Sequence, residues 1–297
     1  MSARRVENLI EPIDTPFEKV VARLVGGEAE QAFIEVPKNF PKSPLRYPGG
    51  KSRAIEAITS CIPANETKLC SPFLGGGSIE LACTTKMSVF GSDVFGPLVD
   101  FWQILLDDRT VLADRVENYY PLSRSKFYNL QKRYTYLDDK IERAAAFFVL
   151  NRSSFSGTTL SGGMSPGHPR FTTSAIERLR SFEVSNFQVE CSDFRDAIAK
   201  NSDAFLYLDP PYVNGQALYG LKGDTHKGFD HEALAEILLK RKRWLMSYND
   251  KPIIRELYKN NQILSVEWIY GMSKNKQSNE ILVLSEDLAI TNILFAT

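Results

Sequence analysis

The chain of 297 residues has few of the side chains that build metal centres or disulfide frameworks. It contains only three histidines, and the four cysteines (Cys61, Cys70, Cys83 and Cys191) have neither metal-binding nor disulfide-framework spacing. We therefore expect no metal site and a reducing, cytoplasmic setting.

Long apolar runs are also absent. No uninterrupted apolar stretch approaches the roughly 20 residues that span a membrane, and the opening residues MSARRVENLIEP lack the apolar segment of a signal peptide. We expect no membrane partner. A hydrophobic content of 43% with 24% charged residues indicates a soluble globular protein, either one large α/β domain with an insertion or two modest domains.

Neither sign of charge is in excess, because 36 basic residues balance 36 acidic ones. The distribution is nevertheless uneven. Residues 121–183 contain ten Lys or Arg against five Asp or Glu, which is a net charge of +5. Such a segment fits a phosphate-binding face, although a solvated helical surface would have the same composition.

Short apolar runs alternate with helical patterns on both sides of a central block. We expect strands at 68–73, 88–92, 187–191, 204–208, 244–248, 263–270 and 280–284. Helices are expected between them at 52–62, 78–84, 194–200, 232–239 and 253–259. This alternation predicts an α/β, Rossmann-like sheet that is mostly parallel, with an antiparallel strand pair at the end joined by a polar link at 271–279.

The central block, residues 110–185, looks like an inserted helical lobe. It contains helical runs and a loop at 153–170 that is too long for a routine connection. We therefore expect a catalytic domain formed by 43–109 and 186–297, with the lobe inserted between its halves. Residues 1–42 are an extension to which the sequence assigns no role.

The most informative segment is Asp209-Pro210-Pro211-Tyr212, which ends the apolar run 204–208. The prolines stiffen the loop and leave their carbonyls free, and the carboxyl end of a parallel strand is where open α/β sheets bind ligands. A carboxylate, rigid carbonyls and a flat ring suit a planar, amino-bearing ring such as a nucleobase. The same four residues could also simply end a strand, with Tyr212 packed as a core aromatic residue.

Two glycine-rich segments precede this one. Pro72–Ser78 joins a strand to a helix and is followed, one strand later, by Asp93, a position suited to ribose hydroxyls. The segment is not the dinucleotide fingerprint, because Glu80 replaces its third glycine. Residues 46–52 imitate a phosphate-binding loop, but Leu45 stands where that motif requires glycine, so we do not expect an NTPase.

In their order and spacing these segments resemble the Dam-type DNA adenine-N6 methyltransferases, from about residue 45 to 284. Residues 46–51 and 72–77 resemble the family's two cofactor motifs, and 209–212 its catalytic tetrapeptide. Residues 247–250 and 278–280 resemble later, softer motifs, and 151–157 the entry to the DNA-contacting segment.

The resemblance implies a Rossmann-like methyltransferase fold with S-adenosylmethionine as the cofactor and double-stranded DNA as the partner. The implied cofactor-binding residues are Tyr47, Lys51, Phe73, Gly75, Gly77, Asp93, Asp193, Phe194 and Asp209, and the catalytic ones are Asp209, Pro210, Pro211 and Tyr212. The residues expected to contact DNA are Arg124, Lys126, Asn151, Arg152, Ser153, Ser156 and Arg170.

The implied reaction is methyl transfer to N6 of an adenine that is flipped out of the duplex and stacked on Tyr212. Two alternatives remain open: a methyltransferase acting on RNA adenine or on cytosine N4, and a catalytically silent DNA-binding regulator with the same fold. Asp rather than Ser at position 209 favours adenine as the target, because this is the residue that the resembled adenine-methylating family has there. The resemblance also implies a prokaryotic or phage origin and allows a cognate restriction endonuclease as partner.

Overall fold

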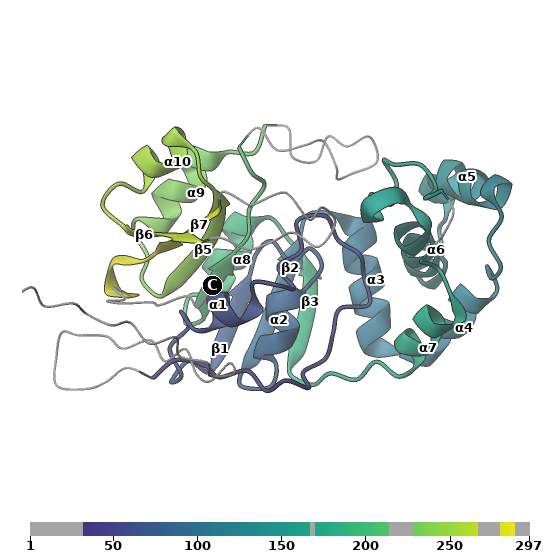
Figure 1. Ribbon diagram of the computed structural model, residues 1–297, viewed down its shortest axis with the longest axis horizontal. Coiled ribbons are helices and arrows are strands. Elements are labelled where there is room, and N and C mark those ends of the chain that lie inside the picture. The colour runs from purple at the N-terminus through teal and green to yellow at the C-terminus, as the bar shows by residue number, and fades with distance from the viewer. Residues whose placement is uncertain (1–31, 167–169, 214–227, 267–279, 289–297) are drawn as a thin grey trace, which may run out of the picture.

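The computed structural model describes residues 32–166, 170–213, 228–266 and 280–288. In this part of the chain seven strands form one sheet in the order β3-β2-β1-β4-β5-β7-β6 (Figure 1). Their bounds are β1 Lys68–Ser71, β2 Ser88–Asp93, β3 Phe187–Cys191, β4 Phe205–Leu208, β5 Trp244–Asn249, β6 Gln262–Val266 and β7 Glu280–Leu284. Strands β1 to β5 pair in parallel, whereas β7 is antiparallel to both β5 and β6. The predicted fold class is confirmed.

The central strands are apolar at nearly every position because both of their faces are covered. All four residues of β4 are buried. Phe205 and Tyr207 belong to the core on one face of the sheet, and Leu206 and Leu208 to the core on the other. This alternation follows from the two-residue period of a strand.

Helices form a layer on each face of the sheet. One core includes residues of α1 (Ile55–Thr59), α2 (Ser78–Cys83) and α3 (Gly96–Asp107). The opposite core includes residues of α8 (Phe194–Lys200), α9 (His231–Leu238) and α10 (Pro252–Leu257). No helix in the described part of the chain has both the length and the apolar character needed to cross a membrane.

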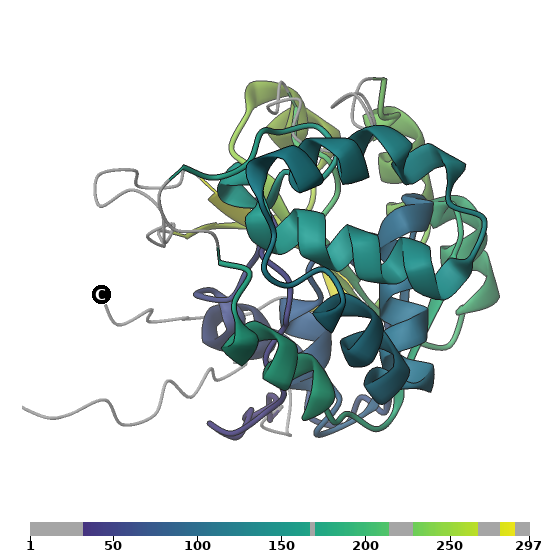
Figure 2. The ribbon, with the colours of Figure 1, turned by 90° about the vertical axis from the view of Figure 1, so that its right-hand side faces the viewer.

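Four further helices lie beyond α3 at one end of the molecule, and Figure 2 shows them facing the viewer. They are α4 (Arg109–Glu117), α5 (Arg124–Arg133), α6 (Lys140–Ser153) and α7 (Thr173–Arg180), and we refer to them as the helical lobe. Helix α6 is buried on all sides from Ala144 to Ser153, as expected of a central helix. Its Phe148 stacks on Phe101 of α3 at 5.7 Å. The lobe therefore shares a core with one face of the sheet.

The loop after α6 closes on itself, although its Gly- and Ser-rich composition did not predict pairing. Ser154 forms an antiparallel bridge with Met164, and Phe155 N donates to Gly163 O at 2.9 Å. From α5, the Gln131 side chain donates to the carbonyls of Thr159 and Gly162 at 3.0 and 2.8 Å. Helix α5 therefore anchors the tip of this loop.

Several predicted elements differ in extent. The strand predicted at 68–73 ends at Ser71, and the helix predicted at 253–259 covers Pro252–Leu257. The helix predicted at 52–62 is shorter, because α1 covers only Ile55–Thr59. The strand predicted at 263–270 begins one residue earlier and is described as far as Val266. Its remainder and the polar link at 271–279 lie outside the described residues.

Candidate active site

Three segments meet at the carboxyl ends of the neighbouring strands β1 and β4. They are the turn at 47–51, the glycine turn that follows β1 and the Asp209–Tyr212 loop that follows β4. The chain leaves β1 toward β2 on one side and arrives at β4 from β3 by a crossover, so this edge is the topological switch point of the sheet. Ligands of open α/β sheets bind at such a point.

Lys51 and Asp209 form the centre of the site. Lys51 Nζ donates to Oδ1 and Oδ2 of Asp209 at 2.9 and 2.8 Å, and to the Gly49 carbonyl at 3.0 Å. The Lys51 side chain is only 3% exposed, whereas that of Asp209 is 22% exposed. Ser247 Oγ donates to Asp209 Oδ1 at 3.0 Å. The carboxylate is thus held in position while one side stays accessible.

Strand β5 orients the loop that carries Asp209 through three consecutive side chains, of which Ser247 is the first. Tyr248 donates its hydroxyl to the Pro211 carbonyl at 3.2 Å, and Asn249 Nδ2 donates to the Val213 carbonyl at 2.9 Å. The Pro210 carbonyl accepts no hydrogen bond from another described residue. Of the two proline carbonyls, only that of Pro211 accepts a hydrogen bond from a described residue.

Tyr212 is fixed at both ends. Its hydroxyl donates to Glu280 Oε1 at 2.8 Å, and its ring stacks on Tyr248 with centroids 5.8 Å apart and planes at 25°. Burial raises the pKa of Tyr212 well above its usual value, so the phenol stays protonated and remains a donor. The sequence assigned no role to Glu280. It lies in the segment 278–280 that resembles a softer family motif, and it opens the otherwise apolar strand Glu-Ile-Leu-Val-Leu.

The glycine turn has room for no side chain. Gly75 and Gly77 have φ values of +48° and +66°, which favour glycine. A Cβ on Gly75 would lie 3.0 Å from the Tyr47 ring, and one on Gly77 would lie 3.0 Å from the Trp102 ring. Tyr47 therefore packs directly against the turn, as a residue that shapes the same pocket would.

Asp93 ties the end of β2 to this turn. Its Oδ2 accepts from Gly75 N at 3.1 Å and its Oδ1 from Phe95 N at 3.0 Å. Burial raises the pKa of Asp93, while the backbone hydrogen bonds act in the opposite direction. The carboxylate thus lies beside the glycine turn, with its orientation set by the backbone.

The remaining predicted cofactor residues lie near the next strand end. Asp193 caps α8 by accepting from Arg195 N at 2.9 Å. Phe194 is only 4% exposed and packs with Phe73 and Phe229, with the three ring centroids 5.5 to 5.7 Å apart. This aromatic cluster forms an apolar wall, of which Phe73 and Phe229 are the partly exposed members.

A buried carboxyl group that the sequence did not single out for catalysis lies beneath the site. Glu80 on α2 is 2% exposed and accepts from Ser71 Oγ at 2.5 Å. Burial raises the pKa of Glu80 to about 7, and the charge of Asp209 adds to this effect. Glu80 is therefore close to half protonated at neutral pH.

The residues predicted to contact DNA fall into two groups. Arg124, Lys126 and Arg170 are exposed, and Ser156 is partly exposed with φ of 54°. Asn151, Arg152 and Ser153 are buried in α6, with Asn151 and Ser153 fully inaccessible. Because they are inaccessible, the side chains of Asn151 and Ser153 do not contact DNA directly in this conformation.

Asn151 instead joins the loop after α6 to the turn that carries Tyr47. Its Oδ1 accepts from Arg46 N at 2.9 Å, and its Nδ2 donates to Arg46 O at 2.9 Å and to Gly157 O at 3.2 Å. Gly157 lies so close to this turn that a Cβ there would approach Arg46 O to 1.8 Å. The predicted DNA-contacting segment is therefore built directly onto the cofactor side of the site.

Four arginines gather at this junction. Arg152 donates to the carbonyls of Arg170 and Pro44 at 3.1 and 3.4 Å. Burial, together with the charges of Arg178, Arg46 and Arg170, lowers its pKa to about 10. Such a cluster of positive charge would be stabilised by an anion.

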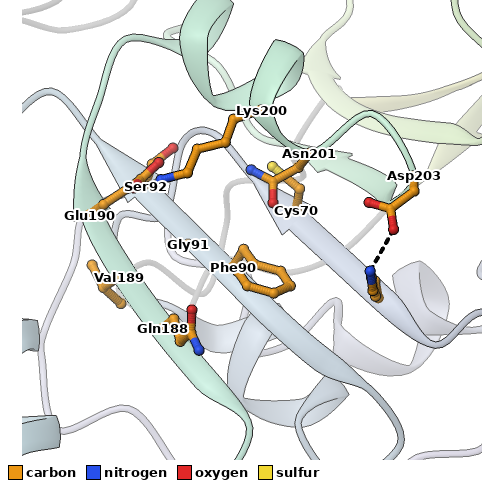
Figure 3. A pocket seen from close by; sticks show the side chains of 11 residues that line it. Cys70, Phe90, Gly91, Ser92, Gln188, Val189, Glu190, Lys200, Asn201 and Asp203 are labelled. Carbon is orange, nitrogen blue, oxygen red and sulfur yellow. Dashed lines mark hydrogen bonds and ion pairs between the residues drawn. The ribbon is translucent and has the colours of Figure 1, made fainter.

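A second hollow, of about 300 Å³, lies on the α8 face of strands β1 to β3 (Figure 3). None of the predicted site residues lines it. Its cations are paired, because Lys68 contacts Asp203 and Lys200 contacts Glu190. Among the described residues no group of three or more His, Cys, Asp or Glu side chains could hold a metal ion.

Comparison with known proteins supports the interpretation of this site. A family model described as D12 class N6 adenine-specific DNA methyltransferase matches residues 47–272. The chain is 25% identical over 256 residues to a DNA N-6-adenine-methyltransferase of Escherichia phage P1, which covers 78% of this chain and 33% of that protein. It is also 25% identical over 251 residues to a DNA adenine methylase of Vibrio cholerae, covering 78% of this chain and 90% of that protein. A type II methyltransferase of Lactococcus lactis is 24% identical over 246 residues, 75% of this chain and 86% of that protein.

Proposed function

Because the chain belongs to the D12 class N6 adenine-specific DNA methyltransferase family, we propose that it methylates N6 of a flipped adenine in double-stranded DNA. The observation that carries this proposal is the Asp209–Tyr212 loop at the switch point of the sheet. This loop brings together a carboxylate, the carbonyl of Pro210 and an aromatic ring. These groups match an amino-bearing planar base.

Asp209 and the Pro210 carbonyl would act on the target amino group. The adenine amino nitrogen is a poor nucleophile because its lone pair is delocalised into the ring. Two acceptors, each at about 2.9 Å from the nitrogen, favour a pyramidal geometry in which the lone pair is available. Ser247 would keep Asp209 oriented during this step. Positioning and electrostatics thus supply the rate enhancement, with no covalent enzyme intermediate.

Tyr212 would hold the flipped ring. Extrusion of a base costs stacking and pairing energy, and stacking on an aromatic side chain recovers about 1–3 kcal/mol. One face of the Tyr212 ring already stacks on Tyr248, and Glu280 fixes its hydroxyl. The ring is therefore preorganised as a platform.

The neighbouring residues fit S-adenosylmethionine, which supplies an electrophilic sulfonium methyl group when bound. Gly75 and Gly77 open the backbone to a ligand, Asp93 offers carboxylate oxygens for ribose hydroxyls, and the cluster of Phe73, Phe194 and Phe229 offers an apolar wall. Lys51 Nζ lies 2.8 Å from Asp209 and 4.0 Å from Glu280, and the buried Glu80 in turn interacts with the charge of Asp209. An acidic surrounding of this kind suits a cationic ligand.

The helical lobe would bind the duplex as the target-recognition part of the protein. Exposed Arg124 and Lys126 on α5, and the arginine cluster beside the loop after α6, would contact phosphates. Phe155, which is 63% exposed in that loop, would present an apolar ring to the DNA. Ser156 and Arg170 would also contact the DNA, because Ser156 is partly exposed and Arg170 is exposed in the same region.

A type II methyltransferase and a modification methylase stand among the relatives. We therefore propose a role in restriction–modification, with a cognate endonuclease as partner, in the cytoplasm of a prokaryote or of a phage-infected cell. Modification would protect the sites that this endonuclease cuts.

The test is transfer of label from radiolabelled S-adenosylmethionine to unmethylated duplex DNA, with RNA and the Asp209→Ala variant in parallel. Label recovered as N6-methyladenine in DNA, and absent with the variant, supports the reaction, the substrate and the catalytic residue. Label in RNA or on cytosine would replace the substrate but keep the mechanism. Cofactor binding without transfer to any nucleic acid would favour a silent DNA-binding regulator.

A further inference from the structure

Glu280 is the first residue of β7 and lies inside the active site. It is 3% exposed, and in the sheet it stands opposite Asn249 of β5 and Val266 of β6. Its Oε1 accepts from the Tyr212 hydroxyl at 2.8 Å and lies 4.0 Å from Lys51 Nζ. A buried carboxylate at this point therefore contacts the proposed stacking ring and faces the ammonium that neutralises Asp209.

Lys51 occupies both oxygens of the group that would receive the substrate. Its Nζ is within 2.9 Å of Oδ1 and Oδ2 of Asp209. A target amino group that donates to Asp209 would compete with this ammonium, because Oδ1 already accepts from both Lys51 and Ser247. A buried ammonium that loses its counter-ion is strongly destabilised. Release of Lys51 from Asp209 thus requires a second acceptor close by.

We propose, on the premise of the proposed function, that Glu280 is a positioning residue of the methyl-transfer site. It fixes the Tyr212 ring through the hydroxyl, and it receives Lys51 when the target amino group takes the place of the ammonium at Asp209. Lys51 needs only a short movement, because its Nζ is already 4.0 Å from Glu280, and the Gly49 carbonyl at 3.0 Å remains within its reach.

The two roles can be separated by substitution. Glu280→Gln keeps an amide oxygen that accepts from Tyr212, but it removes the charge that would receive Lys51. Tyr212→Phe keeps the ring and the Glu280 carboxylate, but it removes the hydroxyl between them. If Glu280 acted through Tyr212 alone, Glu280→Gln would have no effect in a Tyr212→Phe background.

The experiment measures single-turnover methyl transfer to a duplex carrying the target site, which is first mapped with the unsubstituted protein. We expect Glu280→Gln to lower the rate constant about 10- to 100-fold, the range for a lost interaction with a charged group. We expect a loss of similar size when Glu280→Gln is added to Tyr212→Phe. As a control, Glu66→Gln removes another buried carboxylate, which pairs with Arg243 outside the site, and should leave the rate unchanged.

Base flipping can be measured separately from methyl transfer. If Glu280 only maintained the structure, Glu280→Gln would reduce flipping as well as transfer. A duplex with 2-aminopurine at the target position fluoresces when that base leaves the stack. This analogue has no amino group at C6, so it can flip without displacing Lys51 from Asp209. We therefore expect Glu280→Gln to retain the fluorescence change of the wild type while methyl transfer falls.

The outcomes are distinct. A Glu280→Gln protein with the wild-type rate, or one that loses flipping and transfer together, would overturn the role proposed for Glu280. Absence of transfer to DNA adenine by the unsubstituted protein would overturn the proposed function, and the role of Glu280 with it.

Discussion

Lys51 Nζ holds both carboxylate oxygens of Asp209, at 2.9 and 2.8 Å, although the two residues are 158 positions apart in the chain. Both segments end at the same edge of the sheet, where the turn at 47–51 covers the loop after β4. The ammonium occupies acceptor sites for which the proposed substrate amino group would compete. The site is thus arranged for an exchange of one nitrogen donor for another.

Asp209→Ala should abolish methyl transfer, by on the order of 10³-fold or more, because the principal acceptor for the amino group is lost. The fold should persist, since the side chain is partly exposed. Circular dichroism and the radiolabel assay would check both statements. Asp203→Ala is a suitable control, because this exposed carboxylate pairs with Lys68 just before β4. Full turnover by a folded Asp209→Ala protein would contradict the assignment.

Tyr212→Ala should weaken base flipping by the stacking energy of about 1–3 kcal/mol. We expect kcat/KM on a paired duplex to fall about 10- to 100-fold. The loss should be smaller on a duplex in which the target adenine faces a mismatched base, because that base costs less to extrude. Equal losses on both duplexes would indicate that Tyr212 is a packing residue.

Glu80 should make stability depend on pH. Its pKa of about 7 in the folded protein exceeds the ordinary 4.5, so the folded state binds more protons than the unfolded chain between these values. The free energy of unfolding therefore falls as the pH rises through this window. Glu80→Gln should gain stability relative to wild type between about pH 5 and pH 8, by at most about 3 kcal/mol.

Urea unfolding at several pH values would measure this difference. Glu236→Gln, which replaces an exposed carboxylate on α9, is the matched control. A difference between wild type and Glu80→Gln that stays constant over the whole pH range would show that Glu80 does not titrate as inferred.

Gly157→Ala should disrupt the junction between the loop after α6 and the turn at Arg46. The added Cβ meets Arg46 O at 1.8 Å, and φ is +75°. Gly228→Ala separates these causes, because φ there is +82° but no atom of the described residues lies within 4 Å. We expect Gly228→Ala to cost about 1 kcal/mol of unfolding free energy and Gly157→Ala at least twice that. Equal losses of unfolding free energy in the two variants would mean that the contact with Arg46 does not contribute to stability.

Arg170→Ala should weaken DNA binding to a similar degree on all sequences and should lower the salt dependence. Loss of one phosphate contact reduces the slope of log K against log salt by about 1. Affinity measured at several salt concentrations would test this. Arg109, which pairs with Glu183 in the lobe, is the control for a general loss of charge. An unchanged slope for Arg170→Ala would place the phosphate contacts elsewhere.

The sequence predicted local features well where the physical cause is local. Strand β4 is apolar at each position because both faces are covered, and the loop after it is marked by two prolines. The glycine turn was recognisable because only glycine adopts its positive φ values freely. The sequence could not predict that the Tyr47 ring packs against the glycine turn, because this contact joins two separate segments of the chain.

Other features lacked any local signal. The polar run that begins at Asn151 predicted DNA contacts, but α6 is the central helix of the lobe and buries these side chains. Glu280 fell within the segment 278–280 but received no role, because its contact with Tyr212 joins residues 68 positions apart.

By itself the sequence determined the order of strands and helices, the Asp-Pro-Pro-Tyr motif and the family, because these depend on residue type and on spacing along the chain. Only the tertiary structure decided that Asp209 is held by Lys51 and Ser247, that Tyr212 is held by Glu280, and which arginines gather beside the lobe. Burial and charge pairing are set by which segments pack together. A distance along the chain does not specify them.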